Sequence, residues 1–123
     1  RIRQSKDYLR AFPNVQTHCG DGQLLTPFAD QSVGFVFSHV VFPHAPSKDI
    51  VRTYIHEARR VLAPGGIFKF LVKHKGDQPV DTWHGVNVSM EDIAAWRDET
   101  QFELMNSYGV DDNLGCVIFR APA

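Results

Sequence analysis

The chain has 123 residues, of which 43% are hydrophobic and 22% are charged, and its formal net charge is −1. This length suits one domain with a real core and is too short for two. The near-neutral charge gives no electrostatic footprint for a nucleic acid or an anionic membrane, and no apolar run approaches the roughly 20 residues that span a bilayer. We therefore expect a single cytoplasmic domain without a membrane or nucleic-acid partner.

The first third of the chain predicts two strands and a helix already under way at the start. The run before Pro13 is typical of the end of a helix, which favours a partial domain belonging to a longer gene product. Val15 to Cys19 alternates apolar and polar residues, as in a short strand. Val33 to Phe37 is almost continuously apolar, which predicts a central parallel strand buried on both faces.

The next helix carries the strongest periodic signal in the chain. Ser47 suits an N-cap, and Asp49 lies in the first turn, where the helix dipole favours it. The apolar residues then recur at helical spacing and form one stripe: Ile50, Val51, Tyr54, Ile55, Ala58, Val61 and Leu62. Pro64 cannot continue this helix, and Gly65 and Gly66 supply a turn into the strand from Ile67 to Val72.

A long polar connection follows, from Lys73 to Val88. Ser89 and Asp92 then form a variant capping box that opens a helix with Ile93, Ala94 and Trp96. Two final strands, Phe102 to Tyr108 and Cys116 to Phe119, flank a turn-rich joint, which indicates an antiparallel hairpin at a sheet edge. This order of elements predicts an α/β fold with right-handed crossovers. Both cysteines, Cys19 and Cys116, have apolar surroundings and are expected to be reduced and buried.

Four motifs in this order resemble the central and C-terminal part of a class I S-adenosylmethionine-dependent methyltransferase. They are Gly20-Asp21-Gly22, Pro27-Phe28-Ala29-Asp30, Phe35-Val36-Phe37-Ser38 and Arg60-Val61-Leu62-Ala63-Pro64-Gly65-Gly66. The resemblance implies a Rossmann-like methyltransferase sheet that is partial, with strands equivalent to the family's third to seventh. The family's first two strands and its glycine-rich turn have no counterpart in this chain.

The resemblance also implies a set of cofactor contacts. Asp21 occupies the place of the family's acidic residue that accepts a hydrogen bond from the adenine amino group, and Gly22 leaves a backbone N–H open to a ring nitrogen. Ser38 and His39 follow the fourth strand of the family and would line the methionine end of the cofactor. The alternatives are an Asp that serves only its own turn and a strand that runs into a packed loop.

The methyl acceptor is expected to be a small molecule held by loops at the same edge. His44 stands where family members often carry a histidine near the substrate, so it is either a general base or a structural histidine that closes its loop. Val40 would form an apolar wall, with Val41 and Phe42 beside it. Trp83 and His84 either wall the acceptor pocket or anchor a long loop.

Two features depart from a complete methyltransferase. Gly34 stands where the family commonly has an Asp. A glycine within a strand often marks close packing, and the loss of the Asp is a sign of a divergent or impaired enzyme. Without the family's first two strands, the edge from Val33 to Phe37 is bare, so we expect a second copy in a homo-oligomer, a re-paired segment from Val15 to Cys19, or a missing segment of a longer protein to cover it. A non-catalytic α/β remnant or partner-binding module therefore remains the alternative to an enzyme.

Other cofactors are not favoured by the sequence. The six histidines include no helical i, i+4 pair, and no cysteine or carboxylate stands at ligand spacing from them, so no metal site is expected. His56 is assigned to the helix surface. A dinucleotide fingerprint would need a third glycine where Leu25 stands, with a helix opening there.

Overall fold

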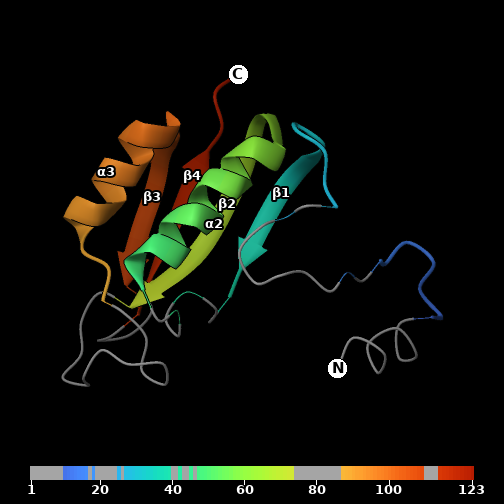
Figure 1. The fold of residues 1–123 in the computed structure, drawn as a ribbon, viewed down its shortest axis with the longest axis horizontal. Coiled ribbons are helices and arrows are strands. Elements are labelled where there is room, and N and C mark those ends of the chain that lie inside the picture. Colours follow the sequence, from blue (N-terminus) through green and yellow to red (C-terminus); the bar gives the residue numbers. More distant parts are fainter. Residues whose placement is uncertain are drawn as a thin grey trace.

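The computed structural model contains a four-stranded sheet with two helices on one of its faces (Figure 1). It describes residues 10–16, 18, 25, 27–39, 42, 45, 47–73, 87–109 and 114–123. The elements in chain order are β1 (Val33–Ser38), α2 (Lys48–Val61), β2 (Leu62–Lys73), α3 (Met90–Thr100), β3 (Glu103–Gly109) and β4 (Leu114–Arg120).

The sheet has the strand order β1-β2-β4-β3, which confirms the expected α/β fold. β1 and β2 are parallel and are joined through α2, whereas β4 is antiparallel to both β2 and β3. The closing hairpin is antiparallel and lies at a sheet edge, as the sequence indicated. The structure adds that its second strand, β4, lies beside β2, so that β3 is the edge strand. This partial Rossmann-like sheet places the carboxyl ends of β1 and β2 at the same edge, where open α/β sheets bind ligands.

The helices form where local sequence signals placed them. Ser47 caps α2, and its hydroxyl accepts a hydrogen bond from the Ile50 N–H. The Ser89 hydroxyl accepts from the Asp92 N–H while the Asp92 carboxylate accepts from the Ser89 N–H, so the predicted capping box is present in α3. Partial burial raises the pKa of Asp92, but hydrogen bonds from Lys48 and Ser89 outweigh it, so that this pKa lies below its ordinary value.

The core lies between the sheet and the two helices and is rich in aromatic rings. Its fully buried side chains include Phe68 and Phe70 of β2, Phe119 of β4 and Ile55 of α2. The rings of Phe68 and Phe70 stack with centroids 4.5 Å apart. Offset and edge contacts of this kind add to the free energy gained by burying apolar area. Cys116 is buried as a free thiol, as expected, whereas Cys19 lies outside the described residues.

Three expectations about strands are wrong in detail. β1 is parallel to β2 but lies at the edge of the sheet that the described residues form, and Phe35 and Phe37 are 57% and 55% exposed, so the strand is neither central in that sheet nor buried on both faces. Of the strand predicted from Val15 to Cys19, the described residues Val15, Gln16 and His18 lie in no strand, and the other two lie outside the described residues.

The third difference concerns the start of β2, which begins at Leu62 rather than after the glycine pair. The C-terminal segment holds this region: the Gly65 N–H donates to the Pro122 carbonyl at 3.1 Å, and the Ala121 N–H donates to the Gly66 carbonyl at 2.8 Å. The Pro-Gly-Gly run is therefore paired backbone at the sheet's end, with Gly65 at φ +76°.

The glycines at the β1–β2 contact play opposite roles. A Cβ at Gly34 would have no atom within 4 Å, so this glycine does not mark close packing. A Cβ at Gly66 would lie 2.8 Å from Leu62 Cδ2 and 2.9 Å from the Ala63 carbonyl oxygen. The close approach that the sequence suggested at Gly34 is instead made by Gly66.

Gly34→Ala is expected to raise the free energy of unfolding by about 0.4–1 kcal/mol, because it restricts the unfolded chain without a clash in the folded one. Gly66→Ala is expected to lower it by about 1–3 kcal/mol, because backbone has to move. Urea titrations of both variants measure this difference. Equal destabilisation by the two substitutions would contradict the assignment.

Candidate functional site

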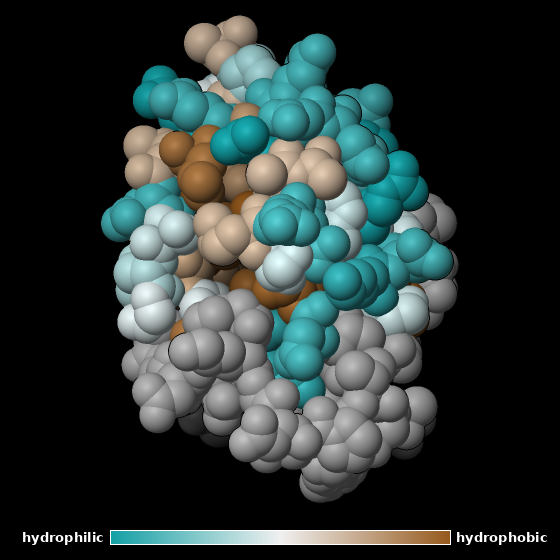
Figure 2. Space-filling view, turned by 90° about the vertical axis from the view of Figure 1, so that its left-hand side faces the viewer, coloured by the Kyte–Doolittle hydropathy of each residue, from teal (hydrophilic) through white to brown (hydrophobic). Residues whose placement is uncertain are grey.

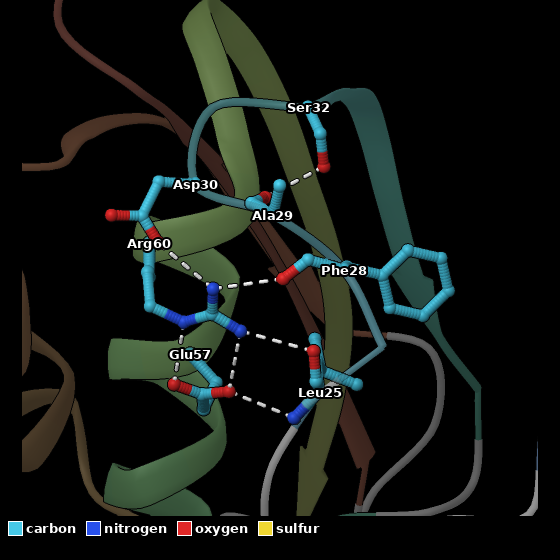
Figure 3. Close-up of polar contacts among 7 residues, drawn as sticks. All are labelled: Leu25, Phe28, Ala29, Asp30, Ser32, Glu57 and Arg60. Carbon is cyan, nitrogen blue, oxygen red and sulfur yellow. Dashed lines mark hydrogen bonds and ion pairs between the residues drawn. The ribbon is translucent and has the colours of Figure 1, made fainter.

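The segment before β1 is fastened to α2 through one arginine (Figure 3). We call this segment the arm and define it as Leu25 and residues 27–32. Arg60 near the end of α2 donates from Nη1 to the carbonyl of Phe28 and to Asp30 Oδ1, both at 2.9 Å. Its Nη2 donates to the carbonyl of Leu25 at 3.0 Å. The arm therefore closes around one guanidinium group.

Glu57, one helical turn earlier, completes this contact from the other side. Its two carboxylate oxygens accept from Arg60 Nε and Nη2 at 2.9 and 3.0 Å. Its Oε2 also accepts from the Leu25 N–H at 2.7 Å. Hydrogen bonds to Glu57 and then to Asp30 raise the pKa of Arg60 above its ordinary value, so the guanidinium keeps its charge. We call Arg60, Glu57 and their arm contacts the clamp.

Backbone hydrogen bonds extend the clamp to the start of β1. The Gln31 N–H donates to the carbonyl of Arg60 at 2.9 Å, and the Ser32 N–H donates to that of Val61 at 2.8 Å. The Ser32 hydroxyl also donates to the Ala29 carbonyl at 2.7 Å. β1 therefore enters the sheet from a fixed point, which sets where its carboxyl end emerges.

A hollow of about 290 Å³ lies at that carboxyl end, between β1, the arm and α2. We call it the β1 hollow. Ser38 and His39 line it from the end of β1, Tyr54 and Ala58 line it from α2, and Leu25 lines it from the arm. Its walls are mainly apolar, with a few polar groups, as in small-molecule sites.

Ser38 and His39, two of the predicted cofactor residues, are thus brought together at a hollow. Ser38 is half-buried and His39 is exposed, so both side chains are accessible from solvent. The ring of His39 lies 5.8 Å from that of Phe37, centroid to centroid. Phe42, expected to be an apolar wall, does line the hollow, but it is only 2% exposed and mostly fills the core.

The other predicted site residues are not placed. Asp21, Gly22, Val40, His44, Trp83 and His84 lie outside the described residues. Their assigned roles in cofactor binding, catalysis and acceptor binding stay predictions. The hollow of about 290 Å³ is suited to one end of an elongated cofactor, and the residues that would hold the adenine end are among those not described.

Sequence reasoning missed Tyr54 and Leu25 as lining residues. Tyr54 belongs to the apolar stripe of α2, and the periodic pattern does not distinguish a residue that lines a hollow from the other members of the stripe. Its ring does pack against Phe42, with centroids 5.5 Å apart, so one side chain serves both core and hollow. No local signal marks Leu25, because its position depends on the clamp.

The structure also bears on the remaining histidines, on metal binding and on membrane-spanning helices. His56 lies on the surface of α2, as expected, and its Nε2 is 2.9 Å from Glu99 Oε2 of α3. Among the residues that the structure describes, no group of three or more histidine, cysteine or acidic side chains is arranged to hold a metal ion. In that same part of the chain, no helix is long and apolar enough to cross a membrane.

The chain belongs to the methyltransferase domain family, whose model matches residues 2–70. The match includes the arm, β1, α2 and the first part of β2, which together form the clamp and the β1 hollow. No curated protein sequence matches the chain significantly.

Solved structures share the fold at low sequence identity. An S-adenosylmethionine-dependent methyltransferase from Methanosarcina mazei superposes with a TM-score of 0.68 at 15% identity, covering 98% of this chain and 77% of that one. A second such enzyme, from Aquifex aeolicus, gives 0.69 at 14% identity and covers 97% and 62%. The [4+2]-cyclase SpnF gives 0.76 at 16% identity and covers 99% and 62%.

Two consequences follow from these comparisons. The chain spans less than two thirds of the length of the A. aeolicus and SpnF structures, so it corresponds to a part of the fold that they contain. A cyclase stands among the structures that share this fold, and fold alone does not determine the reaction.

Proposed function

We propose that the chain is part of an S-adenosylmethionine-dependent methyltransferase that acts on a small molecule. One observation carries the proposal: a family member has Ser38 and His39 at a mainly apolar hollow, at the carboxyl end of its β1. Ligands of open α/β sheets bind at this edge. The same position is the one that the resemblance assigned to the methionine end of the cofactor.

In this proposal, two groups of residues hold the cofactor. Ser38 and His39 would contact its methionine end at the β1 hollow. The Asp21 carboxylate would accept a hydrogen bond from the adenine amino group, and the backbone N–H of Gly22 would donate to a ring nitrogen. The clamp fixes the entry of β1 and hence the position of the first pair.

S-adenosylmethionine supplies an electrophilic methyl group on a sulfonium sulfur. In such a transfer the acceptor's lone pair would form the bond to the methyl carbon while the sulfur–carbon bond breaks and its electrons pass to sulfur. The chain's main task is therefore to align the acceptor and exclude water. His44 is proposed as the general base that takes the acceptor's proton, because a neutral imidazole can do so near pH 7. Val40, Trp83 and His84 are proposed to wall the acceptor pocket.

The alternative is a non-catalytic α/β module that binds a partner. The exposed edge of β1 and the incomplete coverage of the related structures favour it for the chain of 123 residues. Cofactor binding discriminates the two, because a scaffold without a complete pocket has no affinity for S-adenosylhomocysteine.

Calorimetric titration with S-adenosylhomocysteine is expected to show micromolar binding by the folded chain. Ser38→Leu, which adds apolar volume at the mouth of the β1 hollow, is expected to weaken it at least tenfold. Asn106→Leu adds an apolar side chain on strand β3, at a residue that does not line the β1 hollow, and is expected to leave it unchanged. A folded wild-type chain that does not bind would contradict the proposal for this chain and favour the scaffold.

We also propose that the edge of β1 is covered in the working protein. Residues 33–38 carry no charge, and Phe35 and Phe37 expose their rings on one face with centroids 6.2 Å apart. The opposite edge, β3, is protected by Glu103 and by an irregular register between Leu104 and Asn106. In a longer enzyme a strand of the same chain would cover β1, and in the 123-residue chain a second copy would.

Sedimentation velocity of the 123-residue chain is expected to show a dimer. Phe35→Lys adds a charge to the β1 edge and is expected to give a monomer. The control Met105→Lys adds the same charge at the β3 edge, where Met105 is 49% exposed, and is expected to leave the dimer intact. A wild-type monomer at every concentration would show that no second copy covers the edge.

A further inference from the structure

A second hollow, of about 190 Å³, lies between the start of α3, the ends of β2 and β3 and the start of β4. We call it the α3 hollow. It opens at the same end of the sheet as the β1 hollow, the end where β1 and β2 finish. Ser38 of β1 pairs with Phe70 of β2, and Val72, two residues further along β2, lines the α3 hollow. The two hollows are therefore separated along the edge by the end of β2.

The α3 hollow exists because two glycines meet in the sheet. Val72 of β2 pairs with Gly115 of β4, and Gly115 pairs in turn with Gly109 of β3. Paired residues project their side chains to the same face of a sheet. In this row of three, only Val72 has a side chain to fill the space beside α3.

Another part of the wall comes from the chain segment before α3, which a backbone hydrogen bond attaches to β2. The Val88 N–H donates to the Lys73 carbonyl at 2.7 Å, which fixes this segment along the end of β2. Val88 is only 1% exposed, and Val72 and Val117 are also buried, so the floor is apolar and ordered by the core.

The rim combines exposed apolar and hydroxyl-bearing residues. Met90 is 53% and Tyr108 44% exposed, and Ser107 is also exposed. On the side of the molecule that carries α3, hydrophobic residues are visible between hydrophilic ones (Figure 2). None of the described lining residues is charged. A neutral ligand with an apolar body and one polar group at the rim matches this composition.

We infer that the α3 hollow seats the apolar part of the methyl acceptor, a flat ring or a branched alkyl group without charge. This inference rests on the proposed methyltransferase function, since it assigns the acceptor a place beside the β1 hollow. A dry cavity of about 150 Å³ suffices to bind benzene, so the volume accommodates one ring. The acceptor's reacting atom would extend past the end of β2 toward Ser38.

The test uses p-cresol, an apolar ring with one hydroxyl, as the probe for the whole chain. Amide chemical shifts of Gly109, Gly115 and Val117 are expected to move and saturate. Ser107→Leu projects into the hollow, in the row of Val117, and is expected to weaken p-cresol binding at least tenfold. Asn106→Leu, one residue earlier, pairs with Ile118 on the other face and is the matched control, with affinity unchanged.

Parallel titrations with S-adenosylhomocysteine separate this inference from the proposed function. Simultaneous binding of both compounds supports an acceptor seat distinct from the cofactor site. Unsaturable shifts, saturation at Ser38 and His39 instead, or equal effects of the two leucine variants would overturn the site. If p-cresol binds at the α3 hollow but S-adenosylhomocysteine does not bind, the site exists and its assignment to a methyl acceptor is overturned.

Discussion

The guanidinium of Arg60 donates to five oxygen atoms drawn from α2 and from the arm, and the geometry of the β1 end depends on these bonds. Two of them go to backbone carbonyls, which cannot move without moving the arm. A planar group with several fixed donors suits this arrangement, whereas a lysine ammonium would lack the fork that meets both oxygens of Glu57. The arm then delivers its last residues into backbone pairing with the end of α2.

The two helices cover one face of the sheet, and β1 lies at one of its edges. α2 and α3 bury one face, and the strand order leaves β1 with an unpaired edge among the described residues. Strands of parallel sheets are usually covered on both faces and are therefore apolar in composition. β1 has this composition, but the rings of Phe35 and Phe37 are exposed. The mismatch between composition and burial supports the view that the chain works with additional structure beside β1.

Local signals predicted most of the fold, and the exceptions depend on distant contacts. The caps at Ser47 and Ser89 and the stripe of α2 were readable because each involves residues within one or two helical turns. The exposure of Phe35 and Phe37 was not, because burial of a strand depends on neighbours that no local pattern reveals. The motifs with Asp30 and Arg60 were both recognised, but their contact joins residues 30 positions apart and needed the structure.

The candidate site was predicted in part for the same reason. Ser38 and His39 were found because they directly follow a strand, and position at a strand end is a local property. Tyr54 was hidden among core residues of the same helix stripe, and the α3 hollow depends on two glycines that meet only through strand register. Sequence patterns indicate which secondary structure a residue prefers. The hollows, in contrast, depend on how distant residues pack in the folded chain.

Hydrogen exchange of the arm amides tests most directly whether the clamp fixes the entry of β1. The amides of Leu25, Gln31 and Ser32 donate to Glu57, Arg60 and Val61, so they are predicted to exchange as slowly as the core amides of α2. Arg60→Ala is predicted to release the Leu25 amide, whereas the surface control Arg97→Ala, which removes an exposed contact to Asp98, leaves it protected. Rapid exchange of all three amides in the wild type, with α2 still protected, would contradict the account.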